Sequence, residues 1–334
     1  MKHAILQAFV TGTIALAAPV SALAQNDSAA QSNDIDALLL QMTLDEKIGQ
    51  LVQRMGGRSK SLNSQLGPEE LDKVRRGEVG SYLHVAGADA LRELQRVAVE
   101  ESRLGIPLLF SMDVVHGYRT IFPVPLAMAA SWEPEVAERH ARIAATEASA
   151  AGLHWTFAPM VDIARDPRWG RVVEGAGEDA YLGSRMAAAQ VVGFQGSDLS
   201  AADTIMAGTK HFGAYGAAEG GRDYAGAEVS ERVMRETYLA PFRAAAEAGS
   251  ASYMTAFNAL NGVPTTGNEA LLRTMLRDEW GWEGLLLSDW RAVEELMAHG
   301  VAGTRSDAAR LALEASVDMD MVADVYAGDL KQAI

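Results

Sequence analysis

Residues Gly281–Leu296 read GWEGLLLSDWRAVEEL, and this stretch shows how the chain is built. Leu285–Leu287 are three successive leucines, typical of a short strand that is buried on both faces. Asp289 and Trp290 follow where the chain leaves the core, and a helix is expected after them. The stretch is therefore one strand–helix unit with polar chemistry at the end of its strand.

The same alternation of strand and helix runs along the chain. Helical patterns at 133–151, 179–195, 230–248 and 306–315 lie among eight strand-like runs, at 50–55, 79–85, 106–115, 154–163, 205–212, 251–260, 284–290 and 316–322. Such strands pair in parallel, and eight units predict an α/β fold, a closed (β/α)8 TIM-like barrel over residues 35–334. Its last helix, complete or incomplete, is YAGDLKQAI at 326–334. The alternative is a doubly wound open sheet, although no G-x-G-x-x-G follows a strand.

In such a barrel the chemistry lies at the carboxyl ends of the strands. Five consecutive strands end in polar or aromatic residues suited to one site, namely Asp113 and His116, Asp162 with the loop to Arg171, Lys210 and His211, Phe257 and Asn258, and Asp289 and Trp290. This shared register favours a functional site at the mouth of the barrel.

Each of these residues also has a structural interpretation. Asp289 can be the N-cap of the next helix, but position 292 is Ala, so the capping box is missing. Trp290 can be ordinary packing or a flat surface for a sugar ring. Asp113 is expected to pair with Arg119 or Arg171, and its carboxylate can also accept from two adjacent hydroxyls. At these positions we favour the functional interpretation.

Lys210 and His211 are neighbours, and neighbours on a regular strand point to opposite faces. Both reach one ligand only if the backbone is irregular there, for example through a cis non-proline peptide. A phosphate clamp or a surface pair is the alternative. Asp162, Glu178 and Asp179 are interpreted as structural, the last two at the positive end of a helix.

Composition limits the function. The net charge of −15, from 44 acidic and 29 basic residues, argues against nucleic-acid and anionic-membrane partners. The absence of cysteine excludes disulfides, and the histidines have no metal-ligand spacing, so no metal or other cofactor is expected. Residues 1–24 are typical of a secretory signal peptide ending in A-x-A, and 25–34 of a polar linker, which predicts a periplasmic or secreted protein. A membrane anchor is the alternative interpretation of the first segment.

Several long motifs resemble glycoside hydrolase family 3, over about residues 35–330. They are LLQMTLDEKIGQL (39–51), DVVHG (113–117), APMVDIARDPRWGRVVEGAGEDAYL (158–182), KHFGAYGAAEGGRDY (210–224) and NALNGVPTTGNEALLRTMLRDEWGWEGLLLSDW (258–290). Among its members, bacterial periplasmic β-glucosidases are the most similar. The resemblance implies an N-terminal catalytic barrel domain.

The resemblance also implies site residues. Asp289 matches the retaining nucleophile, and Asp113, Arg171, Lys210 and His211 match residues that bind sugar hydroxyls. Trp290 matches the aromatic residue beside the leaving group, while Tyr253, Met254 and Phe257 lie in the segment that lines the pocket. Lys210 and Arg171 are expected to help keep Asp289 ionised near neutral pH.

Two departures from the family concern the acid/base. Larger members take an acid/base glutamate from a C-terminal α/β sandwich domain, which we expect to be absent from this chain. Compact members instead carry a histidine after K-H-F-P-G-H-G, where this chain has KHFGAYG. We therefore expect no acid/base within it.

The resemblance predicts a retaining exo-acting β-glucosidase for β-glucosides and short oligosaccharides. Another exo-glycosidase such as a β-xylosidase, a truncated non-catalytic sugar-binding barrel and a phosphate-binding barrel enzyme are the alternatives.

Overall fold

The computed structural model describes residues 34–56, 67–85 and 87–334. Residues 34–42 belong to one compact unit, in which 34–41 are helical, and residues from Thr43 onward belong to a second. The predicted signal peptide and residues 25–33 of the predicted linker lie outside the described residues. None of the helices in the described ranges has the length and apolarity needed to cross a membrane.

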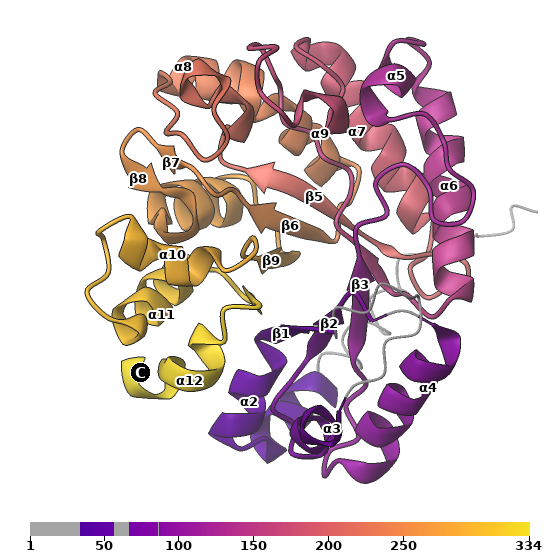
Figure 1. Ribbon diagram of the computed structural model, residues 1–334, viewed down its shortest axis with the longest axis vertical. Helices are drawn as coiled ribbons and strands as arrows, with labels where there is room; N and C mark the ends of the chain where they lie inside the picture. Colours follow the sequence, from indigo (N-terminus) through magenta and orange to yellow (C-terminus); the bar gives the residue numbers. More distant parts are fainter. Residues whose placement is uncertain (1–33, 57–66, 86) are drawn as a thin grey trace, which may run out of the picture. The chain divides into compact units, whose positions relative to one another are not determined.

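The second unit is built around eight parallel strands (Figure 1). They are β1 (Val52–Met55), β2 (Ser81–Leu83), β3 (Leu109–Met112), β4 (Trp155–Thr156), β5 (Met206–Phe212), β6 (Ser252–Thr255), β9 (Leu285–Leu287) and β10 (Asp320–Met321). Their order is β10-β1-β2-β3-β4-β5-β6-β9, and a single parallel bridge from Leu287 to Met319 joins the two ends. The sheet is thus a nearly closed (β/α)8 barrel, as predicted, and not a doubly wound sheet.

Each predicted strand run contains one of these strands, but the strands are shorter than the runs. The run at 251–260 also contains β7 (Ala259–Leu260), which forms an antiparallel hairpin with β8 (Val263–Pro264). The sequence analysis did not foresee this hairpin. Asn261 and Gly262 form its turn and both have positive φ, the conformation that such two-residue turns require.

Helices cover the outside of the barrel. The longer ones are α2 (Leu44–Gln50), α3 (Pro68–Arg75), α4 (Ala88–Arg96), α6 (Pro134–Ala150), α7 (Ala180–Gln195), α9 (Ala240–Glu247), η7 (Ala270–Glu279), α10 (Ala292–Ala298), α11 (Arg305–Glu314) and α12 (Val325–Ala333). Short helical segments are η1 (Val97–Glu101), α5 (Pro125–Ala129), η2 (Val172–Glu174), η3 (Tyr215–Ala217), η4 (Glu219–Gly221), α8 (Glu231–Val233), η5 (Met234–Tyr238) and η6 (Thr265–Gly267). The helix predicted at 230–248 is α8, η5 and α9 in succession, and Pro241 at the start of α9 accounts for that break.

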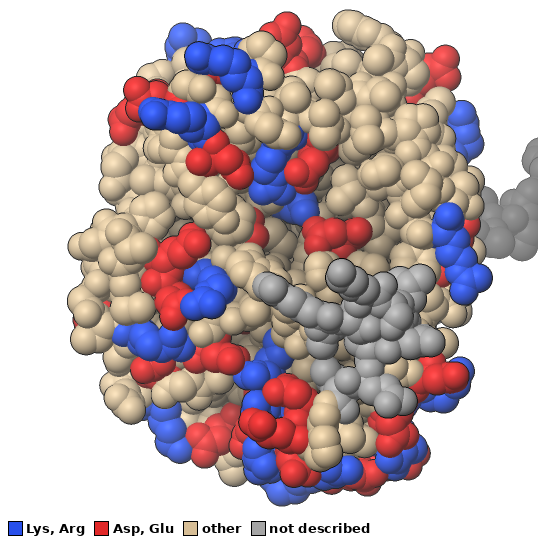
Figure 2. Space-filling view, in the orientation of Figure 1, with Lys and Arg blue, Asp and Glu red and all other residues tan. Residues whose placement is uncertain are grey.

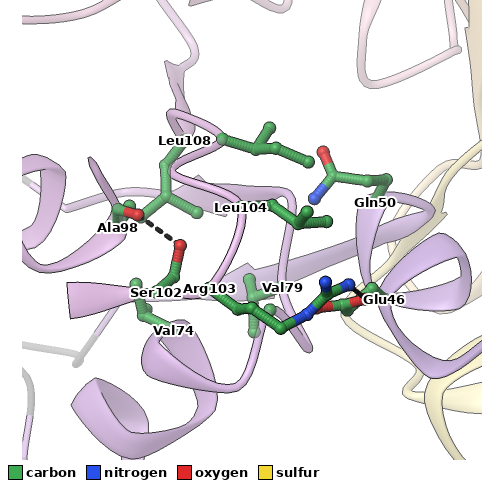
Figure 3. Close-up of a pocket in the computed structure, with 11 residues that line it drawn as sticks. Glu46, Gln50, Val74, Val79, Ala98, Ser102, Arg103, Leu104 and Leu108 are labelled. Carbon is green, nitrogen blue, oxygen red and sulfur yellow. Dashed lines mark hydrogen bonds and ion pairs between the residues drawn. The ribbon is translucent and has the colours of Figure 1, made fainter. Parts of the chain in front are cut away.

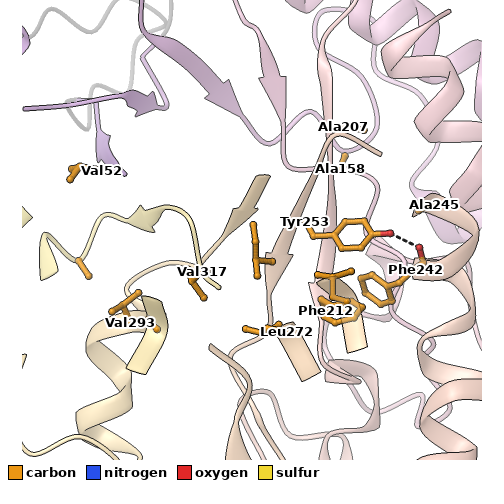
Figure 4. Close-up of a cluster of buried hydrophobic side chains, with 14 of the residues drawn as sticks. Val52, Ala158, Ala207, Phe212, Phe242, Ala245, Tyr253, Leu272, Val293 and Val317 are labelled. Atoms are coloured by element: carbon orange, nitrogen blue, oxygen red, sulfur yellow. Dashed lines mark hydrogen bonds between the residues drawn. The ribbon is translucent and has the colours of Figure 1, made fainter. Parts of the chain in front are cut away.

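Side-chain alternation divides the core into two layers. Tyr253 and Leu286 pack against the helices, whereas Met254 and Leu287 lie in a second cluster inside the barrel. Figure 4 shows the outer layer, where the Tyr253 hydroxyl donates to the Phe242 carbonyl. Tyr253 therefore faces the helices, and the prediction that it belongs to a pocket-lining segment is wrong for its side chain.

A small cavity of about 20 Å³ lies between α2, α3 and η1 (Figure 3). Polar and apolar residues line it about equally, and Arg103 forms an ion pair with Glu46 at 2.5 Å between Nη2 and Oε2. None of the predicted site residues lines this cavity. We therefore interpret it as a packing defect beside a structural ion pair.

Candidate active site

Charged side chains converge at the carboxyl ends of the strands. Figure 2 shows acidic and basic atoms side by side in a hollow near the centre of the viewed face. Asp113 directly follows β3, Lys210 and His211 lie near the end of β5, and Asp289 follows β9 by two residues. The structure thus brings together residues that are far apart in the sequence, as the strand-end register predicted.

Asp289 is almost buried, with 9% of its side chain exposed. Its Oδ1 accepts a hydrogen bond of 2.6 Å from the Trp290 backbone N–H. Its Oδ2 has no hydrogen-bond partner among the described residues, and the His211 Nε2 atom lies 3.5 Å away. Arg291 is the N-cap of α10, so Asp289 does not have the N-cap position that was its structural alternative.

Burial raises the pKa of Asp289 to about 7. The hydrogen bond from Trp290 and the charges of Lys210 and Arg171 oppose this shift, while Asp113 adds to it. The two cations therefore act in the predicted direction, but burial is the larger effect, because a carboxylate loses its hydration in a low-dielectric site. Ionisation of Asp289 is therefore less favourable than that of an exposed aspartate.

Asp113 forms an ion pair with Lys210, at 2.7 Å between Oδ1 and Nζ, and contacts His84 at 3.2 Å between Oδ2 and Nε2. Burial acts to raise the pKa of Asp113, but Lys210 and His84 outweigh it, and the pKa lies well below its usual range. The expected pairing with Arg119 or Arg171 is wrong. Lys210 takes that place, and its side chain is nearly buried, with 6% exposed.

Arg171 binds Glu174 through two hydrogen bonds, of 2.8 Å and 3.0 Å. Its guanidinium lies over the ring of Tyr215, 5.6 Å from the centroid. Burial acts to lower the pKa of Arg171, but the Glu174 carboxylate outweighs it and the pKa lies above its usual range, with smaller contributions from the charges of Asp289 and Asp162. Glu174 is thus the residue that holds Arg171 in place.

The backbone is irregular at Lys210 and His211, as predicted. A cis peptide bond joins the two residues, and the register of β5 against β6 shifts between Thr209 and Phe212. Ala207 and Phe212 both pack in the outer layer, although an odd spacing of five places residues of a regular strand on opposite faces. This break in alternation lets both side chains address the mouth of the barrel.

The apolar residues predicted to contact a ligand differ in how much of their side chain is exposed. Trp290 is partly buried and packs against the cluster of Met254 and Leu287 and against a further buried cluster that contains Phe257. Phe257 is 7% exposed and lies against Tyr224, with 4.4 Å between ring centroids. Met254 is only 3% exposed inside the barrel, which leaves it little surface for a ligand.

Three residues near the site were not predicted as site residues. Asp162, interpreted as structural, binds His211, and His84 binds Asp113. Tyr224 lies on the loop after β5, half exposed above Phe257. His84 follows β2 directly, so the rule that strand ends carry the chemistry would have found it. Asp179 caps α7 by accepting from the Leu182 N–H, as expected.

Within the described residues, no group of three or more His, Cys, Asp or Glu could hold a metal ion. The arrangement is instead a nearly buried carboxylate with a free oxygen, set among cations and hydrogen-bonding groups. Such a pocket suits a neutral polyhydroxylated ligand, because carboxylates accept and ammonium and guanidinium groups donate hydrogen bonds to hydroxyls.

Comparisons with known proteins identify relatives of this chain. The chain is 43% identical over 290 residues to the periplasmic beta-glucosidase of Salmonella typhimurium, which covers 86% of this chain and 37% of that protein. It is 34% identical over 326 residues to a putative beta-xylosidase of Formosa agariphila, over 91% of this chain and 43% of that protein. The chain thus spans about two fifths of the length of these relatives.

The chain is also similar to a solved structure of a beta-glucosidase. The crystal structure of beta-glucosidase from Listeria innocua in complex with glucose superimposes with a TM-score of 0.83 and 40% identity, over 90% of this chain and 43% of that chain. Residues 43–334 match the family model described as the glycosyl hydrolase family 3 N terminal domain. The chain therefore belongs to glycoside hydrolase family 3, and residues 43–334 are its N-terminal barrel domain.

Proposed function

We propose that this chain is the nucleophile-bearing domain of a retaining, exo-acting β-glucosidase, with Asp289 as nucleophile. The observation that carries the proposal is the free Oδ2 atom of Asp289, buried at a strand end between opposing charges. A retaining glycosidase needs a carboxylate with one oxygen directed at the anomeric carbon. The names of the relatives support glycoside hydrolysis, and the Listeria structure with glucose supports a sugar ligand.

In this proposal Asp289 Oδ2 attacks the anomeric carbon, the bond to the leaving oxygen breaks, and a covalent glycosyl-Asp289 forms. Asp113, Arg171, Lys210 and His211 bind the hydroxyls of the sugar, and contacts that strengthen in the transition state lower the barrier. Trp290 and Phe257 provide the apolar contacts of the pocket, whereas Met254 lies inside the barrel and offers a ligand little surface.

The sugar itself is part of the proposal. Glucose is favoured by the first relative and by the Listeria structure, and xylose is the alternative because the Formosa relative is named a putative beta-xylosidase. A periplasmic or secreted location is proposed from the N-terminal sequence and from the name of the Salmonella relative. A non-catalytic sugar-binding barrel is the alternative to an enzyme.

Mass spectrometry after treatment with 2,4-dinitrophenyl 2-deoxy-2-fluoroglucoside tests the proposal. A fluoroglucosyl adduct on the peptide that contains Asp289 supports a retaining glucosidase, and faster labelling by the matching xyloside would assign the sugar to xylose. Sugar binding without any adduct would identify a binding protein.

The labelling rate should depend on pH. Asp289 must be ionised to attack, and burial raises its pKa to about 7. The rate should therefore increase as pH rises through that value and level off above it, because protonation removes the nucleophile. Asp113 stays ionised throughout, since its pKa is lowered. A rate that stays constant down to about pH 5 would contradict the raised pKa.

Replacement of Asp113 by alanine should lower the labelling rate by about 30- to 1,000-fold, because charged hydrogen bonds to hydroxyls contribute roughly 2–4 kcal/mol to transition-state binding. The loss should be smaller for a sugar that already lacks the hydroxyl bound by Asp113. Comparison of the parent sugar with its 4-deoxy and 6-deoxy analogues measures this difference.

Asp318→Ala is the matched control for Asp113→Ala. Both carboxylates are 39% exposed and ion-paired, Asp318 with Arg277 at 2.6 Å, but Asp318 precedes β10 and so lies at the other end of the strands. The control should leave the discrimination between analogues unchanged. Equal losses for every analogue in Asp113→Ala would mean that Asp113 only supports the fold.

A further inference from the structure

Three buried groups form a line across the mouth of the barrel. Asp162 Oδ2 lies 2.8 Å from His211 Nδ1, and His211 Nε2 lies 3.5 Å from Asp289 Oδ2. The side chains of Asp162 and His211 are 0% and 1% exposed. The single ring of His211 thus connects a fully buried carboxylate with the proposed nucleophile.

The side chain of Asp162 accepts its hydrogen bonds from His211. Its Oδ2 accepts from both the backbone N–H of His211, at 3.0 Å, and the ring. Its Oδ1 is buried without a hydrogen-bond partner among the described residues. A buried carboxylate oxygen without a partner is unfavourable, so packing alone does not account for an aspartate here.

The contacts of His211 define its tautomer. A carboxylate can only accept, so the ring donates through Nδ1–H to Asp162. Burial, Arg171 and Lys210 lower the pKa of His211 well below its ordinary value, and the ring is therefore neutral. A neutral imidazole carries one proton, so Nε2 is bare when Nδ1 holds it. Tyr215 contacts the ring edge to face, with 5.3 Å between centroids, and restricts its rotation.

We propose that Asp162 is a positioning residue, which holds His211 in the Nδ1–H tautomer so that a bare Nε2 faces Asp289 and the bound sugar. The carboxylate fixes both the ring and the backbone N–H of the residue that carries it. This is the arrangement by which a hydrogen bond to one imidazole nitrogen determines the chemistry of the other.

Two consequences follow, the first of which rests on the proposed function. A bare Nε2 accepts a hydrogen bond from a sugar hydroxyl and cannot donate one, so replacing that hydroxyl by fluorine should weaken binding as much as replacing it by hydrogen. Second, a negative charge on Asp162 disfavours ionisation of Asp289, since two nearby carboxylates repel each other. Burial raises the pKa of Asp162 itself to about 7, so this repulsion acts above that pH.

Nitrogen-15 NMR of the histidine rings tests the tautomer without any substrate. The chain has seven histidines, and the spectrum of His211→Gln identifies the signal of His211 by its loss. We expect a neutral ring with the proton on Nδ1 at neutral pH. Asp162→Asn should keep this tautomer, because its amide oxygen can accept the same hydrogen bonds, whereas Asp162→Leu should release the ring to the Nε2–H tautomer. An imidazolium or an Nε2–H ring in the parent chain would overturn the proposal.

The pH profile of labelling by the 2-fluoroglucoside tests the charge. Asp162→Asn removes one negative charge near Asp289, so the acid limb should move to lower pH by roughly one unit. A lower rate with an unmoved limb would mean that Asp162 has only a structural role. Six other titratable groups face these three residues and are the same in the parent chain and in Asp162→Asn. They are Asp113, Arg171, Glu174, Lys210, Tyr215 and Tyr224.

Asp320→Asn is the matched control. Asp320 is also fully buried, one of its oxygens accepts from the backbone N–H groups of Val325 and Tyr326, and its other oxygen has no partner among the described residues. This variant should leave the acid limb in place. If the parent chain is never labelled, the proposed function fails, but the NMR result still decides the role of Asp162. If Asp162→Leu does not fold, Asp162→Asn and the parent spectrum still decide it.

Discussion

Replacement of Asp289 by asparagine is expected to reduce the rate of glycosyl-enzyme formation by about 10⁴- to 10⁶-fold, the range found when a nucleophile or its activating partner is removed. The amide has nearly the same shape but is a very poor nucleophile. The position of Asp289 at the end of β9, with its Oδ2 atom free, is the reason for this expectation. Near-normal turnover of this variant would show that Asp289 is not the nucleophile.

The same substitution should not weaken the fold at neutral pH. Burial raises the pKa of Asp289 to about 7, far above the 3.8 of the unfolded chain. Between these pH values Asp289 is protonated in the native state and ionised in the unfolded chain. The free energy of unfolding therefore falls as pH rises from about 4 to 7. Asparagine removes this loss, and urea unfolding at neutral pH should show equal or greater stability.

A second variant separates loss of the nucleophile from damage to the pocket. Asp289→Gly leaves a space where the carboxylate stood, and azide can attack the anomeric carbon from that side. An activated dinitrophenyl glucoside should then give the α-glucosyl azide, since only one inversion takes place. Azide that fails to raise the rate, in a variant that still binds glucose, would argue against this geometry.

Much of the fold could be predicted because barrel strands carry a repeated local pattern. Leu285–Leu287 form a strand that is apolar on both faces, and polar residues follow it. Strand and helix alternate along the whole chain and polar residues end five consecutive strands, so the nearly closed barrel and the convergence of Asp113, Lys210 and Asp289 followed from these patterns. The strand lengths did not, because the apolar runs continue into loops that are also buried, as at Phe157 and Val161 after β4.

The partners within the site could not be predicted in the same way. Lys210 and Asp113 are 97 positions apart, and His211 and Asp162 are 49 apart, so no local pattern connects them. The sequence also did not predict the direction in which the pKa of Asp289 shifts. The two nearby cations suggest a lowered pKa, but burial has the larger effect and raises it. Distance and burial are tertiary properties, and only the folded chain reveals them.

The 334-residue chain should hydrolyse glucosides at rates that depend steeply on the leaving group. Formation of glycosyl-Asp289 from an alkyl glucoside or cellobiose requires a proton on the departing oxygen, a step that general acids accelerate by about 10²–10⁴-fold. Two carboxyls on the loops after β4 and β5 are poorly suited to this task. Glu174 is ion-paired with Arg171, and Asp223 accepts a hydrogen bond of 2.9 Å from Trp169.

Cellobiose should therefore react about 10²- to 10⁴-fold more slowly than it would with a positioned acid. 2,4-Dinitrophenyl glucoside departs without a proton and should form the covalent intermediate at a normal rate. The intermediate should then accumulate, because the group that protonates the leaving oxygen is also the base that activates water. A burst of dinitrophenolate followed by slow turnover is the expected time course.

Azide decides between the two possible locations of the acid/base. It needs no base, so it should restore turnover of dinitrophenyl glucoside and give the β-glucosyl azide by a second inversion at the anomeric carbon. Fast cellobiose hydrolysis that azide does not affect would instead place the acid/base within this chain. Glu174, Asp223 and the exposed Glu219 of η4 would then be the residues to replace, and the variant that loses cellobiose turnover but keeps the dinitrophenolate burst would identify it.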